Sequence, residues 1–260
     1  MDELVNITLI RLISAYIFIL FLLMIVKTQK IGHEWEIILA TGRMTVQLIL
    51  VGYVLTYIFN HPDIFLSLGV LALMELFAIH NIFSRVKSEI NKKLKYLITI
   101  AMVTGTGTSI AFFTFIILNL KPWYLPQYII PISGMLIGNS MTGITLGVEG
   151  LTGGIKDNKE MIENALMLGA TPELSTRDIA NRAFYNALLP TLNSMIGMGI
   201  IFLPSMMTGQ ILAGASPLVA IRYQLAIMLG ITGSVTLTVY ILVRWGARTY
   251  FNKRAQLELS

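Results

Sequence analysis

The sequence predicts an all-α integral membrane protein with about seven transmembrane helices. Hydrophobic residues make up 55% of the 260 residues and charged residues 13%, which is not the composition of a soluble globular domain. The apolar residues gather in seven runs, and each is near the ~20 residues that a helix needs to cross the hydrocarbon core. The chain has no cysteine, which excludes disulfides, zinc–thiolate sites and catalytic thiols.

The expected spans cover residues 7–26, 37–59, 63–82, 97–118, 128–147, 187–208 and 218–243. A helix is the expected form of each span, because a backbone in lipid must satisfy its own hydrogen bonds. Residues 1–260 are therefore expected to form a single polytopic transmembrane domain. The acidic start MDELVN is not followed by a small-residue cleavage site, so we expect no removable signal peptide.

The basic residues between the spans predict the orientation of the chain in the cell membrane, because cytoplasmic connections are enriched in Lys and Arg. The connections that face the opposite side contain one such residue, Lys121. Fifteen lie in the first, third and fifth connections and the C-terminal tail: Lys27, Lys30, Arg85, Lys87, Lys92, Lys93, Lys95, Lys156, Lys159, Arg177, Arg182, Arg244, Arg248, Lys253 and Arg254. This bias places the N-terminus outside and the C-terminus in the cytoplasm.

The only long polar stretch, residues 157–190, is predicted to be a cytoplasmic amphipathic hairpin. Asp157, with Glu160 after it, suits the start of a short helix. Gly169 can end that helix, and Thr171-Pro172 suits the cap and first residue of a second one. The first helix would carry an apolar face of Met161, Ile162, Ala165 and Leu166. Such a hairpin either docks into a groove of a soluble partner or lies on the membrane surface.

Charged side chains inside the second and third spans are candidates for a transport pathway. A charge in a membrane helix costs ~2.5–3.5 kcal/mol on insertion scales, so it normally faces protein or water. Arg43 either forms a polar stripe with Gln47, one turn further along, or snorkels to the cytoplasmic surface. Glu75 is the deepest carboxylate, and it either pairs with Arg43 or contacts a substrate or cation.

Polar and small residues also mark the later spans. The small residues of the fourth span, GTGTS at 105–109, and the glycines of the fifth suit close packing of helices. Asn139, in the fifth span, either lines a pathway or bonds across helices. The uncharged stretch 206–217 predicts a broken helix or a re-entrant turn. Gln210 in this stretch, with Arg222 and Gln224 after it, forms either a polar rim of the pathway or an ordinary extracellular turn.

The sequence contains no pattern for catalysis or nucleotide binding. It has no Walker A motif, so any ATP hydrolysis must come from another chain. It has neither an HExxH nor a GxSxG motif, so we expect no enzyme and no catalytic residues. The three histidines, His33, His61 and His80, are spread over different parts of the chain and make no metal cluster by spacing, so metal ligands stay unidentified.

The hairpin resembles the coupling loop of ABC-transporter permeases, in which Glu-Ala-Ala is followed by a glycine and later by Leu-Pro. The matching residues are Glu163, Ala165, Gly169, Leu189 and Pro190, and Asn164 departs from the motif. MTGQILAG at 207–214, GNSM at 138–141 and R-x-x-V-Q-L in the second span are together similar to one family. That family includes the bacterial iron exporter subunit FetB and the plant aluminium-sensitivity permeases, and the similarity covers nearly the whole chain.

The resemblance implies a permease subunit that pairs with a separate ABC ATPase, which would bind ATP and Mg²⁺; the chain itself would hold no cofactor. ABC architecture implies two copies of the permease in the lipid membrane, and nothing implies nucleic acid. The substrate expected from the relatives is a small one, a metal ion such as iron moved in the export direction. Two alternatives stay open: an ion-coupled secondary transporter or channel that needs no ATP, and an ABC permease for a nucleotide sugar.

Overall fold

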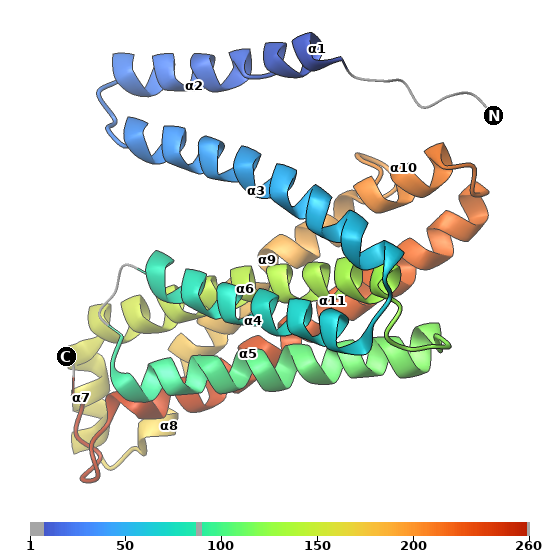
Figure 1. The fold of residues 1–260 in the computed structure, drawn as a ribbon. Coiled ribbons are helices and arrows are strands. Elements are labelled where there is room, and N and C mark those ends of the chain that lie inside the picture. Colours follow the sequence, from blue (N-terminus) through green and yellow to red (C-terminus); the bar gives the residue numbers. More distant parts are fainter. Residues whose placement is uncertain (1–7, 87–89, 259–260) are drawn as a thin grey trace. The chain divides into compact units, whose positions relative to one another are not determined.

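The computed structural model describes residues 8–86 and 90–258, and within these ranges it consists of helices without a β-strand (Figure 1). The predicted all-α class is therefore confirmed. The first residue of the expected span 7–26 and the basic residue Lys87 lie outside the described residues. The chain divides into two compact units. One unit ends at His61 and includes Leu212–Gly214, and the other comprises Pro62–Ile211 and everything from Ala215 onward.

The first unit is built from α1 (Leu9–Ser14), α2 (Ile17–Thr28) and α3 (Glu34–Asn60). The hydroxyls of Tyr16 and Thr45 lie 2.6 Å apart and join the start of α2 to α3. Leu9–Thr28 and Glu34–Asn60 are both long and apolar enough to cross a membrane. They correspond to the first two expected spans.

The second unit is organised around one long central helix. This helix, α6, packs against α4, α5, α9 and α11. In chain order the elements are α4 (Ile64–Arg85), α5 (Lys92–Phe112), the π-helical turn η1 (Phe113–Leu118), α6 (Pro126–Asp157), α7 (Lys159–Met167), α8 (Pro172–Ser175), α9 (Arg177–Gly197), α10 (Ser205–Leu212), α11 (Pro217–Gly246) and the 3₁₀ turn η2 (Ala247–Tyr250).

Small residues let α11 approach its neighbours closely. A Cβ on Gly143 of α6 would lie 2.8 Å from Cγ1 of Val235, too close to be accommodated without a shift. Gly105 of α5 has no room for a Cβ against Thr238. The hydroxyls of Ser140 and Ser234, both fully buried, lie 2.9 Å apart and join α6 to α11. The predicted role of the small residues in helix packing is confirmed at these positions.

The expected span 187–208 is not one helix. Six helices of the described ranges are long and apolar enough to cross a membrane, and this segment is not among them. The prediction was wrong because α9 begins at Arg177, so its charged first turns belong to the same helix as its apolar end. The chain then leaves the helix between Gly197 and Ser205, at Gly199 with a φ of +85°. The stretch 206–217, where a break was predicted, contains a second one: α10 ends at Leu212 and α11 begins at Pro217, with Gly214 between them at a φ of +95°.

The orientation of the chain stays a prediction, and with six candidate membrane helices it requires one further crossing. An outside N-terminus and a cytoplasmic C-terminus need an odd number of crossings, so α9 and α10 together would make the seventh. The packing of α9 is compatible with this role. The side chain of Ala187, in the middle of α9, lies against Gly147 of α6, and Gly147 also faces Leu242 of α11. Since α6 and α11 are both membrane candidates, α9 runs alongside them.

Candidate functional site

The polar hairpin follows α6 with almost no linker. The long helix continues to Asp157, and α7 begins two residues later at Lys159. Asp157 is therefore the last residue of α6 and not the cap of α7, which corrects the prediction. Asn158 occupies the cap position, but its side-chain amide donates backwards to the carbonyl of Gly154 at 2.8 Å and leaves the first turn of α7 without a side-chain cap.

The turn after α7 has the conformation expected from its glycine. Gly169 has a φ of +90° and nothing within 4 Å of the position of a Cβ, so the glycine is needed for its backbone conformation and not for space. Its N–H donates to the carbonyl of Leu166 at 3.0 Å, and the N–H of Ala170 donates to that of Ala165 at 2.9 Å. These two hydrogen bonds close the end of α7 around a residue in the left-handed conformation. The predicted glycine turn is confirmed.

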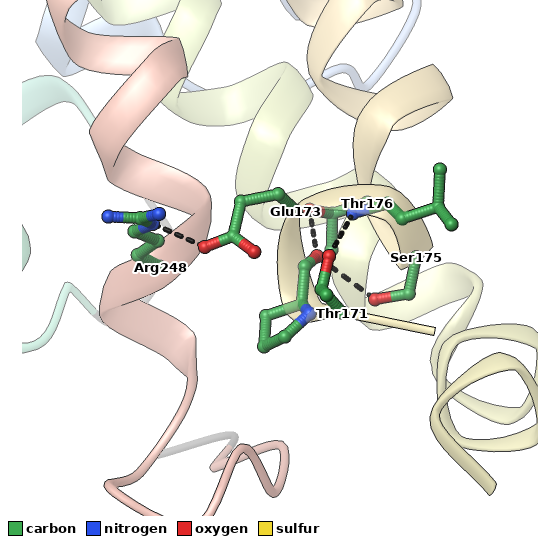
Figure 2. Close-up of polar contacts among 7 residues, drawn as sticks. Thr171, Glu173, Ser175, Thr176 and Arg248 are labelled. Carbon is green, nitrogen blue, oxygen red and sulfur yellow. Dashed lines mark hydrogen bonds and ion pairs between the residues drawn. The ribbon is translucent and has the colours of Figure 1, made fainter. Parts of the chain in front are cut away.

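The second helix of the hairpin starts where the sequence predicts. The Thr171 hydroxyl accepts the N–H of Leu174 at 3.3 Å, and Pro172 is the first residue of α8. Figure 2 shows the side chain of Glu173 reaching to Arg248 of η2, where Nε–H donates to the carboxylate. The pKa of Glu173 is lowered, first by its own backbone N–H and then by Arg248 and Thr171. Glu173 and Arg248 therefore hold α8 to the end of α11.

The predicted apolar face of α7 is divided between two environments. Ile162 is completely buried and Leu166 packs against the same core, so both side chains help to hold the second unit together. Apolar side chains on the other side of the hairpin are left exposed, up to 90% for Leu168. The exposed set, called the hairpin surface below, is Met161, Met167, Leu168 and Leu174. Three of these four were missed from the sequence, although their place on either side of Gly169 was visible.

The residues of the coupling motif lie at different distances from this surface. Glu163 is half-exposed and its carboxylate lies 3.8 Å from the ammonium of Lys159, one turn earlier. Ala165 is half-buried at the edge between the core side and the exposed side of α7. Leu189 and Pro190 lie inside α9, and a helical rise of 1.5 Å per residue puts them about 20 Å from its first residue. The Leu-Pro pair thus lies away from the turn itself.

A cavity of about 400 Å³ opens among α4, α5, η1 and α6 in the second unit. Its wall is almost entirely apolar, with Leu71 and Ala72 on α4, Ile110 on α5 and the ring of Trp123 among its members. Of the described residues in this wall, Glu75 alone is ionisable. In the parts of the chain that the structure describes, no group of three His, Asp or Glu residues is arranged to hold a metal ion.

The carboxylate of Glu75 is only half satisfied. Its Oε2 accepts a hydrogen bond from the Thr106 hydroxyl at 3.1 Å. That hydroxyl also lies 2.6 Å from the carbonyl of Met102, so its single hydrogen is shared. The other oxygen, Oε1, is buried and has no partner among the described residues. A buried acceptor without a partner is costly, so this site suits a cation, a proton or a hydrogen-bond donor on a substrate. The role of Thr106 as a neighbour of Glu75 was not predicted.

The other predicted pathway residues lie in several places. In the described ranges, the buried side-chain atoms without a hydrogen-bond partner include Oε1 of Gln210 on α10 and Oε1 of Gln224 on α11. Arg222 is exposed on α11. Asn139 is exposed, and its amide donates to the carbonyl of Met135 in its own helix at 2.8 Å. Their assignment to a pathway stays a prediction.

Arg43 and Gln47 lie on α3, which belongs to the first unit, whereas Glu75 lies on α4 in the second. The proposed pairing of Arg43 with Glu75 therefore also stays a prediction.

Comparison with known proteins identifies the family. Residues 9–251 match the model described as Uncharacterised protein family (UPF0014). The chain belongs to this family. It is therefore a multi-pass membrane protein, in agreement with its apolar helices. No solved structure matches it.

The relatives of this UPF0014 chain come from bacteria and plants. It is 40% identical to the UPF0014 membrane protein YjkA of Bacillus subtilis over 87% of the chain and 88% of YjkA. It is 33% identical to the Probable iron export permease protein FetB of Escherichia coli over 97% of the chain and 95% of FetB. It is also 33% identical to Protein ALUMINUM SENSITIVE 3 of Arabidopsis thaliana, over 94% and 88% of the two chains. The predicted family resemblance is confirmed.

Proposed function

We propose that this chain is the permease subunit of an ABC transporter that exports a metal ion such as iron, driven by ATP hydrolysis in a separate ATPase subunit. The observation that carries the proposal is the α7–α8 hairpin. Its turn is closed by the N–H groups of Gly169 and Ala170, and Thr171 caps α8. Its inner face packs into the core, and its outer face is apolar and exposed. The partner ATPase would bind the ATP and Mg²⁺, and two copies of the permease would pair with two ATPases.

The exposed apolar side chains of the hairpin surface favour a protein partner over water. Leu168 and Met167 are exposed by 90% and 78%. Burying them in a groove lowers the free energy, because it removes apolar surface from water. Charged residues lie beside them, with Lys159 and Glu163 at the edge of α7. An apolar ridge with charges at its edge fits the groove of a soluble protein. The basic connections support a cytoplasmic position for this hairpin, where ATP is available.

The cavity beside Glu75 supports a cationic substrate. A carboxylate in an apolar wall attracts a positive charge and repels a phosphate. This electrostatic argument favours a metal ion over a nucleotide sugar, and one relative is named a probable iron export permease. The same carboxylate would also suit an ion-coupled carrier without an ATPase, so the decisive difference between the two functions is the need for ATP.

Reconstitution into liposomes tests the proposal. The purified chain is combined with the ABC ATPase that co-purifies with it, and uptake of Fe²⁺ into inside-out vesicles is measured with ATP and with a non-hydrolysable analogue. We expect Fe²⁺ uptake with ATP and no uptake with the non-hydrolysable analogue. Transport without ATP would show an ion-coupled carrier, and ATP-driven movement of a nucleotide sugar without iron would show a different substrate.

One substitution on the hairpin surface isolates the docking step. Leu168→Asp puts a charge into the proposed groove contact, so the ATPase should no longer co-purify while membrane insertion stays normal. The matched control is Ala255→Asp, which adds the same charge on the exposed C-terminal tail, at a φ of 58° that Asp tolerates. Equal retention of the ATPase by both variants would contradict the role of the hairpin.

A further inference from the structure

A second cavity, called the arginine pocket here, lies next to α8 of the hairpin. It has a volume of about 260 Å³ and is enclosed by α8 and the first turns of α9 on one side and by the end of α11 and η2 on the other. All of these elements belong to the second unit. Neither the coupling role of the hairpin nor the cavity at Glu75 uses this pocket.

The wall of the arginine pocket changes from basic to aromatic along its length. On α9, Arg177 and Phe184 line it two turns apart, which places them on one face of the helix. On α11 and η2, the lining residues Tyr240, Arg244 and Arg248 follow at intervals of four residues and also share a face. Because α9 starts and α11 ends beside the hairpin, the arginines meet at one end of the pocket. Phe184 and Tyr240 lie at the other end of the pocket, further from the hairpin.

Two of the three arginines that line the pocket have no acidic partner among the residues that the structure describes. Among the described lining residues Glu173 is the one acidic side chain, and it is bound to Arg248 (Figure 2). Its lowered pKa keeps it ionised. Arg177 and Arg244 make no ion pair or side-chain hydrogen bond with any residue that the structure describes. The bond from Arg248 uses Nε–H alone, and a guanidinium carries five N–H donors. The pocket therefore has a net charge of about two positive units and free donors.

We propose that the arginine pocket binds a phosphate group, with its guanidinium groups on the phosphate oxygens and its aromatic end against the carbon chain that carries them. Arginine forks match phosphate geometry and form charge-assisted hydrogen bonds. An anionic phospholipid fits both ends, because basic pockets between helices on the cytoplasmic side bind lipid headgroups. A small soluble phosphate compound would use the same basic end. In either case the ligand would link α9 to α11 next to the Glu173–Arg248 contact. It would thereby stabilise the packing of the hairpin against the end of α11.

The polarity of the two ends favours the lipid as the source. A free phosphate ion gains nothing from Phe184 and Tyr240, whereas the glycerol and first methylenes of a lipid remove these rings from water. This inference does not depend on the ATPase, because every residue involved belongs to this chain.

Thermal unfolding of the full chain in detergent tests the inference. The unfolding temperature is measured while short-chain phosphatidylglycerol is added, and again with phosphatidylcholine of the same chain length, with inorganic phosphate and with glycerol 3-phosphate. The test variant is Arg177→Gln/Arg244→Gln, which removes both unpaired guanidinium groups. The matched control is Arg182→Gln/Arg254→Gln, which removes two exposed arginines of the same cytoplasmic side that do not line the pocket.

We expect phosphatidylglycerol to raise the unfolding temperature, and its half-saturating concentration to rise roughly tenfold or more in the test variant. The control should respond like the wild type. The same loss seen with inorganic phosphate or glycerol 3-phosphate would support the phosphate site with a soluble source. Equal responses to phosphatidylglycerol and phosphatidylcholine with none to the soluble phosphates, or an equal loss in the control variant, would overturn the inference. A test variant that is less stable before any addition still reports the ligand shift, since the shift is measured against its own baseline.

Discussion

The α7–α8 hairpin and the cavity at Glu75 differ in how far their polar groups are satisfied. In the hairpin, Thr171 caps α8, the N–H groups of Gly169 and Ala170 close α7, and Glu173 binds Arg248. In the cavity, one oxygen of Glu75 stays buried without a partner among the described residues. A turn with satisfied polar groups beside an exposed apolar surface suits a protein partner. An open polar atom in an apolar wall suits a small cationic ligand.

The largest expected effect comes from the turn of the hairpin. Gly169→Val forces a β-branched residue into the left-handed region, at a cost of ~1 kcal/mol or more, or it changes the angle between α7 and α8. We expect almost complete loss of ATPase co-purification with normal membrane insertion. The matched control is Gly153→Val, because Gly153 also has open space around it but lies inside α6 without a positive φ. If both variants keep the ATPase, the geometry of the turn does not matter for docking.

Glu75→Gln is the corresponding change in the cavity. It keeps the shape of the side chain and removes the charge, so iron transport should fall tenfold or more, the loss expected when a charge-assisted contact worth about 1.5–3 kcal/mol disappears. Glu75→Leu should abolish transport and leave the unfolding temperature unchanged or higher, because it removes a buried acceptor without a partner. A Glu75→Leu protein that is inactive because it unfolds at a lower temperature would contradict this view of the site.

A double-mutant cycle tests whether the two units meet at these charges. If Arg43 pairs with Glu75, each Ala substitution leaves the other charge uncompensated, and the double variant should be less damaged than the sum of the two. The quantity to compare is the transport rate of the wild type, Arg43→Ala, Glu75→Ala and the double variant. Strict additivity would show that the two side chains do not touch.

A smaller effect is expected at α10. Gln210→Leu removes a side-chain carbonyl that is buried without a partner in the described part of the chain. If this atom contacts the substrate, transport should fall severalfold while expression and ATPase association stay normal. Transport at the wild-type rate would favour a structural role for Gln210 within α10 over a polar rim.

The smallest effect is expected at the edge of the hairpin surface. Glu163→Gln removes a half-exposed pair with Lys159, and such pairs contribute about 0–1 kcal/mol. ATPase affinity should change less than about fivefold, as measured by titration of the ATPase onto the reconstituted chain. A loss as large as that of Gly169→Val would mean that Glu163 makes a buried contact with the partner.

Local chemistry made several features predictable from the sequence. The helical class followed from apolar runs long enough to cross a membrane. Gly169, Thr171 and Pro172 were predictable as the turn and cap because their backbone preferences act within a few residues. Asp157 was predicted wrongly as a cap, since α6 continues through it and the helix boundary depends on packing of the preceding residues. The sixth expected span, 187–208, was misplaced because hydropathy could not show that the charged and apolar halves of α9 form one helix.

The sequence by itself determined the membrane class, the hairpin turn and the residues worth testing, because each depends on composition or on neighbours in the chain. Only the tertiary structure decided which of them meet. Thr106 lies beside Glu75, and Arg177 shares a pocket with Arg244, although long stretches of chain separate the members of each pair. It also divided α7 into a side that fills the core and a side that is exposed. Such contacts depend on how helices pack, and packing is set by side chains distant in sequence.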